Sequence, residues 1–183
     1  MDLHELLSHI ETALDKCQDI INENRYVVLS EGDLERLVCR CITDEIKEEM
    51  GTLHDFSVHS QVSHYYEEDG KPSVDARVDV LLLKESELQG QIYHKEFKYD
   101  GDSFAMELKY LHKNDSISKV KCDFCKWSSI RNDSWMYVVV LIDGYSDIDI
   151  QKKEDKIKLM YEQELLKYES DQNENQLKYK VLH

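Results

Sequence analysis

Two apolar runs decide the fold of this chain: Arg77-Val78-Asp79-Val80-Leu81-Leu82-Leu83 and Trp135-Met136-Tyr137-Val138-Val139-Val140-Leu141-Ile142. Apart from the two charged residues of the first run, both are apolar or aromatic, and each predicts a buried strand. A lone carboxylate inside such a strand is costly unless it is paired or binds a cation. Asp79 is therefore the first candidate functional residue.

A third strand-like run covers residues 103–111, with Met106-Glu107-Leu108-Lys109-Tyr110 at its centre. Side chains alternate between the two faces of a strand, so Glu107 and Lys109 are expected on one face and their apolar neighbours on the other. An acid on one strand and a Glu-x-Lys pair on another can satisfy one another and a divalent cation. Asp79, Glu107 and Lys109 are thus expected to converge.

The rest of the chain shows helical or strand periodicity in turn. The expected elements are a helix over 2–22, a second helix from a Ser30 cap to Gly51, a strand over 55–66 joined by a turn at 67–72 to the run 77–83, a helix behind Asp115 or Ser116 that includes Trp127 and reaches toward Ile130, a helix over 151–168, and a short strand over 177–181. Residues 84–102 are expected to form a polar loop.

The size of the chain bounds its organisation. With 183 residues, 41% of them hydrophobic, it can bury one good core, so we expect a single domain with an N-terminal helical extension at 1–29, a core at 30–143, and a C-terminal helix and strand at 144–183. The sequence contains neither an apolar run of about 18 residues nor a signal-peptide pattern, so we expect a cytoplasmic protein that does not bind membranes. The five cysteines are an odd number and are expected to be reduced.

The net charge of −15 is unusual for a protein that binds nucleic acid, because such binding depends on neutralising phosphates. The acids are concentrated in the first half of the chain. Between residues 103 and 131 there are six lysines and arginines against three acids. Two interpretations stay open for this segment: a positive patch beside the candidate site, or an ordinary solvated helix face.

The candidate residues resemble the PD-(D/E)XK nuclease superfamily, whose signature is an acid on one strand and an acid-x-lysine on the next. The matching residues are Asp79, Glu107 and Lys109, with Val78 where many members have proline. The order helix, strand, strand, strand, helix, strand over 30–143 resembles the core of that superfamily. The resemblance implies an α/β fold with a restriction-endonuclease-like αβββαβ core, in which a mixed central sheet is flanked by helices.

The resemblance also implies an activity, that of a Mg²⁺-dependent (or Mn²⁺-dependent) nuclease that hydrolyses phosphodiester bonds, in DNA rather than RNA, alone or within a larger assembly. Asp79, Glu107 and the backbone carbonyl of Leu108 would bind the metal ion. Lys109 would orient or help deprotonate the attacking water and offset negative charge in the transition state.

Two assignments within the site have alternatives. Many members of the superfamily use a glutamate from the first core helix, for which we favour Glu35 over Glu45, although both positions are also typical of surface acids beside a buried face. Asp75 is the second candidate for the role of Asp79, because it lies nearer the turn of the expected hairpin.

Other patterns point to different chemistry or a different class of protein. Four cysteines in two close pairs could be counted as zinc ligands: Cys39, Cys41, Cys122 and Cys125. Residues two apart on a helix point about 200° away from each other, which argues against that site. The alternative to an enzyme is a catalytically silent interaction module, such as an immunity or inhibitor protein with an acidic surface. In either case the amphipathic first helix could cover the core, bind a protein partner or form a homodimer.

Overall fold

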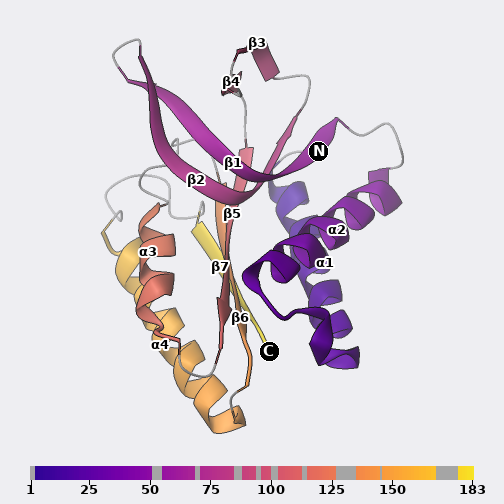
Figure 1. The fold of residues 1–183 in the computed structure, drawn as a ribbon, viewed down its shortest axis with the longest axis vertical. Helices are drawn as coiled ribbons and strands as arrows, with labels where there is room; N and C mark the ends of the chain where they lie inside the picture. Colours follow the sequence, from indigo (N-terminus) through magenta and orange to yellow (C-terminus); the bar gives the residue numbers. More distant parts are fainter. Residues whose placement is uncertain are drawn as a thin grey trace.

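The computed structural model describes residues 3–50, 55–68, 71–84, 88–93, 96–99, 103–112, 115–126, 135–144, 146–167 and 177–183. A five-stranded mixed sheet lies between two layers of helices, and Figure 1 shows this sheet nearly edge-on. The expected α/β class and the expected mixed sheet flanked by helices are confirmed.

The sheet has the strand order β1-β2-β5-β6-β7. Its strands are β1 (Phe56–Glu68), β2 (Lys71–Lys84), β5 (Ser103–Leu111), β6 (Trp135–Ile142) and β7 (Leu177–Leu182). Strands β1, β2 and β5 are antiparallel neighbours, whereas β5, β6 and β7 run parallel. The predicted hairpin is confirmed, but its strands are longer than expected and include most of the predicted turn at 67–72.

Two helices cover each face of the sheet (Figure 1). On one face lie α1 (Leu3–Glu23) and α2 (Glu31–Met50), joined by the short 3-10 helix η1 (Arg25–Val27); on the other lie α3 (Ser118–Lys126) and α4 (Asp147–Leu165). Helix α4 begins four residues before the predicted start at 151, because the Ser146 side chain accepts a hydrogen bond from the Asp149 N–H and caps it.

The polar loop predicted for 84–102 is wrong in part. Strands β3 (Leu88–Tyr93) and β4 (Glu96–Tyr99) pair there in a separate two-stranded sheet. Two short strands with mixed polar and apolar residues give too weak a periodicity to be distinguished from a loop.

The start of α2 is confirmed at the predicted Ser30 cap. The Asp33 N–H donates to Ser30 Oγ at 3.2 Å, Ser30 Oγ–H donates to Asp33 Oδ2 at 2.8 Å, and the same Asp33 oxygen accepts the Leu29 N–H at 3.1 Å. Side chain and backbone thus satisfy each other around the first turn of the helix, in the manner of a capping box.

Each face of the sheet carries its own hydrophobic cluster. Met106 and Leu108 belong to the cluster under α1 and α2, whereas Ala105 and Leu111 belong to the one under α3 and α4. The predicted alternation along β5 is therefore confirmed, and it directs the intervening Glu107 and Lys109 toward the α3 face. All eight residues of β6 are buried, as expected for a central strand.

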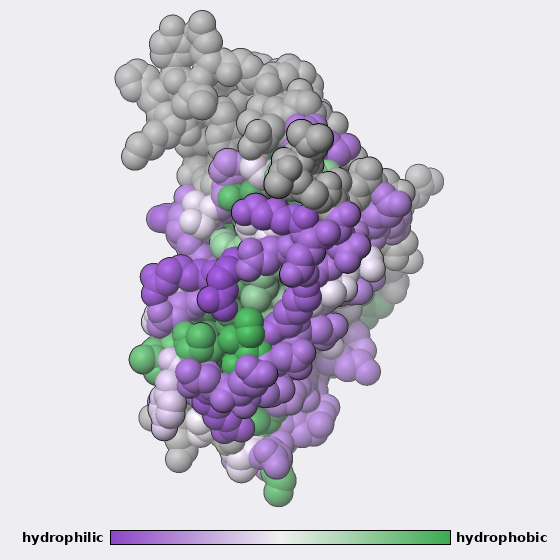
Figure 2. Space-filling model, turned by 90° about the vertical axis from the view of Figure 1, so that its right-hand side faces the viewer, coloured by the Kyte–Doolittle hydropathy of each residue, from purple (hydrophilic) through white to green (hydrophobic). Residues whose placement is uncertain are grey.

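The outer surface of the α1 and α2 layer is largely hydrophilic. Figure 2 views the molecule from that side and shows mostly hydrophilic side chains, with a compact hydrophobic area among them. Among the described residues, no helix is both long enough and apolar enough to cross a membrane.

Candidate active site

The candidate site lies where β2 separates from β5. The two strands pair from Leu83 opposite Ser103 to Val80 opposite Met106, and within the described residues the pairing goes no further. Beyond Met106, β5 keeps β6 on one side, while its other edge is left open to side chains.

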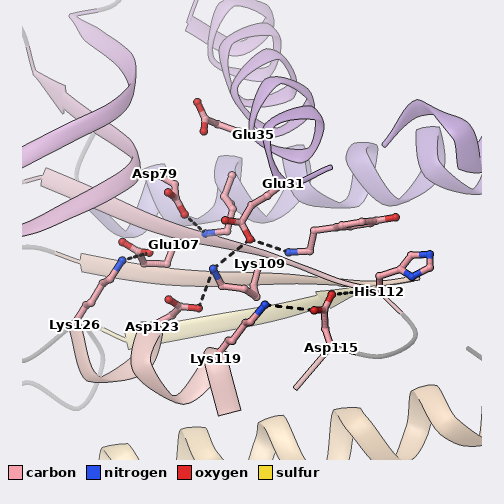
Figure 3. Close-up of polar contacts among 12 residues, drawn as sticks. Glu31, Glu35, Asp79, Glu107, Lys109, His112, Asp115, Lys119, Asp123 and Lys126 are labelled. Atoms are coloured by element: carbon pink, nitrogen blue, oxygen red, sulfur yellow. Dashed lines mark hydrogen bonds and ion pairs between the residues drawn. The ribbon is translucent and has the colours of Figure 1, made fainter. Parts of the chain in front are cut away.

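Two carboxylates take the place of the missing strand at this edge. The Leu108 N–H donates to Asp79 Oδ2 at 2.8 Å, and the Tyr110 N–H donates to Oε2 of Glu31, the first residue of α2, at 3.3 Å. Backbone donors that face no neighbouring strand need such partners, so the open edge of β5 fixes the position of both acids. Asp79 is held beside Glu107 for this reason (Figure 3).

Glu35 reaches Asp79 through an intervening amide. Gln61 Nε2, from β1, donates to Glu35 Oε2 at 2.6 Å and to Asp79 Oδ1 at 3.2 Å. Glu45, the alternative from the same helix, lies elsewhere, because its carboxylate is buried between α1 and α2 and contacts Lys16 Nζ at 2.8 Å. Of the two helix acids, only Glu35 is connected to Asp79 by described contacts. The side chain of the rival Asp75 lies outside the described residues.

Glu107 is almost fully buried, with 1% of its surface exposed. Its Oε2 accepts a hydrogen bond from Lys126 Nζ of α3 at 2.5 Å, whereas its Oε1 is buried and has no hydrogen-bond partner in the described part of the chain. Burial raises the pKa of Glu107 to about 7; Lys126 acts in the opposite direction, while Asp79 adds to the increase. The carboxyl is thus buried, only half satisfied and close to a second acid.

Asp123, also from α3, adds another buried acid to the site. Its Oδ2 has no hydrogen-bond partner among the described residues and lies 3.7 Å from Lys109 Nζ. Burial raises the pKa of Asp123 to about 6, although Lys109 and Lys126 oppose this. The carboxyl therefore changes charge near neutral pH.

Lys109 lies between acids from both helical layers (Figure 3). In addition to Asp123, its Nζ donates to Glu31 Oε2 at 3.2 Å. Burial alone would lower the pKa of Lys109, but Asp123, Glu31 and Asp79 outweigh burial and raise it. The side chain is consequently a stable ammonium, suited to stabilising negative charge and holding a water molecule rather than to removing a proton in this state.

The residues present can be tested as ligands for a metal ion. The described residues contain no group of three or more His, Cys, Asp or Glu side chains placed to hold one. Mg²⁺ in proteins commonly uses only one or two carboxylates together with water, so Asp79 and Glu107 meet its minimum. In a strand the carbonyl of a residue points to the same edge as its N–H, so the Leu108 carbonyl is directed to the side of Asp79. The unpartnered Glu107 Oε1 fits a cation, and the donor set therefore suits Mg²⁺.

The four-cysteine zinc site is excluded by the fold. Cys39 and Cys41 are on α2, whereas Cys122 and Cys125 are on α3, and these helices lie on opposite faces of the sheet.

Four side chains of this cluster were missed in the sequence: Glu31, Gln61, Asp123 and Lys126. Asp123 did leave a signal, because it follows Val120 by three residues and directly precedes Phe124, which places an acid within a buried helical stripe. A carboxylate in a buried stripe is as costly on this helix as Asp79 is in its buried strand, unless it is paired or binds a cation. Nothing in the sequence around Gln61 indicates its role.

Comparison with known proteins adds no relative: no protein-family model matches the chain, and neither a curated protein nor a solved structure matches it. The function is therefore inferred from the geometry of the site.

Proposed function

We propose that this protein is a Mg²⁺-dependent nuclease of the PD-(D/E)XK type with a restriction-endonuclease-like core, acting on DNA. One observation carries the proposal: Asp79, Glu107 and Lys109 come together from two strands at the point where those strands separate, and a buried oxygen of Glu107 has no hydrogen-bond partner among the residues that the structure describes. Structural salt bridges alone do not account for such an oxygen, because burying a carboxylate without full hydrogen bonding is costly.

Each residue has a defined part in this proposal. Asp79, Glu107 and the Leu108 carbonyl would hold the metal ion, and a bound ion would supply Lewis-acid polarisation of the phosphate and a lower pKa for the attacking water. Lys109, as an ammonium, stabilises the charge that develops on the phosphate oxygens and orients the water. Glu35, joined to Asp79 by Gln61, adds a carboxylate from α2 to those of Asp79 and Glu107.

The net negative charge of the chain is compatible with this activity, because the charges are segregated. Helices α1 and α2 contain twelve acids and four lysines or arginines, whereas α3 and α4 on the other face contain seven lysines and seven acids, with three lysines and one acid on α3 itself. The two groups lie on opposite faces of the sheet (Figure 1). We therefore expect nucleic acid to approach along α3, away from the hydrophilic face in Figure 2.

The test is cleavage of labelled double-stranded DNA, single-stranded DNA and RNA with Mg²⁺, with Mn²⁺ or with EDTA. We compare the wild type with Lys109→Ala, and use Lys47→Ala, an exposed lysine of α2, as the matched control. Metal-dependent cleavage of DNA is expected to fall by roughly 100-fold or more in Lys109→Ala and to persist in Lys47→Ala.

Absence of cleavage on every substrate, with all proteins folded, would contradict the nuclease proposal. The remaining candidate would then be the silent interaction module, which is favoured by one observation, the concentration of acids on α1 and α2. Binding of that layer to a basic protein would be its test.

A further inference from the structure

Gln61 has an unusual backbone conformation in the middle of β1. Its φ of 55° makes it the only non-glycine residue with a positive φ among those the structure describes. Ser60 pairs with Val80 and Val62 with Val78, which leaves Gln61 opposite Asp79. Residues with a Cβ rarely adopt this conformation, and where they do, the strain is commonly found at functional sites.

The strained backbone places one amide group between two acids. Gln61 Nε2 donates to Glu35 Oε2 at 2.6 Å and to Asp79 Oδ1 at 3.2 Å. An amide nitrogen has two hydrogens, so one can serve each carboxylate. Because both bonds share that nitrogen, the two oxygens cannot be farther apart than the two bond lengths together. Two anions that would otherwise repel each other are thus held close.

We infer that Gln61 is a positioning residue of the proposed active site, which holds Glu35 beside Asp79 at the metal site. The inference rests on the proposed function. Glu35 belongs to α2 and Asp79 to β2, and Gln61, from a third element, connects them (Figure 3 shows the two acids). Residues that orient metal ligands typically change metal affinity by 10-fold to 100-fold when they are removed.

If the role of Gln61 were purely structural, replacing it would change stability rather than metal affinity. The Gln61→Gly variant distinguishes the two roles. Glycine adopts a positive φ without strain, so Gln61→Gly keeps or improves the fold while removing the amide. Gln61→Asn keeps an amide on a shorter side chain, and asparagine tolerates this backbone conformation better than most residues. A Gln61→Gly variant that loses metal affinity but keeps its stability would therefore show that Gln61 is a positioning residue.

The experiment is calorimetric titration of Mg²⁺ and of Mn²⁺ alone into the full chain. The variants are Gln61→Gly, Gln61→Asn, Glu35→Gln and the double variant Gln61→Gly/Glu35→Gln, with Gln163→Ala on the exposed side of α4 as the matched control. We expect metal affinity to fall about 10-fold in Gln61→Gly and in Glu35→Gln. The double variant should be little weaker than Glu35→Gln, because without the Glu35 charge the amide contacts only Asp79, which the Leu108 N–H also holds in place.

The outcomes distinguish the two proposals. Wild-type protein that binds neither metal would overturn the nuclease function and this inference with it. Wild-type binding that Gln61→Gly leaves unchanged, or losses that add fully in the double variant, would overturn only the role of Gln61. Thermal unfolding of each variant shows whether a loss of affinity reflects a loss of fold.

Discussion

Replacing Glu107 with glutamine should make the protein more stable at pH 8. Glu107 is buried, and its Oε1 has no hydrogen-bond partner among the described residues. An uncharged amide of the same shape avoids the cost of burying an ionised carboxylate. The proposed metal ligand would thus be held at the expense of stability, which is a frequent property of active sites.

The magnitude follows from the pKa of Glu107, which burial raises from 4.5 to about 7. Between these pH values the folded protein keeps a proton that the unfolded chain has lost, so stability falls as the pH rises and stays lower above pH 7. Each unit of difference in pKa corresponds to about 1.4 kcal/mol, so the ionised Glu107 lowers the free energy of unfolding by about 3 kcal/mol at pH 8. For a chain of this length that is roughly 6 to 12 °C in Tm.

The assay is urea unfolding of wild type and Glu107→Gln at pH 4.5 and pH 8 in EDTA. At pH 4.5 the two proteins should differ by less than about 1 kcal/mol, and at pH 8 the variant should be more stable. Glu45→Gln is the control with the opposite sign: burial would raise the pKa of Glu45, but Lys16 and His9 outweigh burial and lower it, so losing this charge should destabilise the fold at pH 8. A Glu107→Gln variant less stable than wild type at pH 8 would refute the reasoning.

The other predictions concern the same site and the elements that position it. Asp123→Asn should also raise stability above about pH 6, because burial raises the pKa of that carboxyl, and should slow cleavage about 10-fold by removing a partner of Lys109; urea unfolding and single-turnover cleavage measure the two effects. Phe124→Ala should cost about 3 to 5 kcal/mol in urea unfolding, because this side chain is fully buried against tyrosines of α4 and β7. Ser30→Ala should cost about 1 kcal/mol through loss of the α2 cap, measured in the same way. Lys121→Ala, on the exposed side of α3, should weaken DNA binding and reduce the slope of log affinity against log salt by up to about 0.9, as followed by fluorescence anisotropy; an unchanged slope would exclude α3 from the interface.

The parts of the fold that were predictable have strong periodicity. An uninterrupted apolar run identified β6, and strict alternation identified the faces of β5, because burial on a sheet imposes a period of two. Strands β3 and β4 were not found, since short strands with mixed polar and apolar residues give no regular pattern. In the site, Asp79, Glu107 and Lys109 could be selected because charges in buried strands are exceptional.

The separation of β2 from β5 and the contacts across it are tertiary effects that no local pattern encodes. Gln61 acquires its role only because its positive φ places an amide between acids of two other elements. Asp123 was recoverable from its helical stripe, but its meeting with Lys109 depends on how α3 packs against β5. Local sequence therefore indicates which charged residues are buried at a cost in stability, whereas the packing of helices and strands decides which of them are in contact.

The acids of the site differ in what they can reveal about function. Asp79 and Glu31 accept hydrogen bonds from backbone N–H groups at the open edge of β5, so a protein without catalytic activity would still need them to satisfy that edge. Glu107 and Asp123 each bury an oxygen without a hydrogen-bond partner among the described residues, and their raised pKa values show that the charged forms oppose folding. An interaction module gains nothing from that cost, because amides would fill the same space without it. Loss of stability in an Asp79 variant is thus compatible with either class of protein. A gain of stability with loss of metal binding in Glu107→Gln, and with slower cleavage in Asp123→Asn, is expected only of an enzyme.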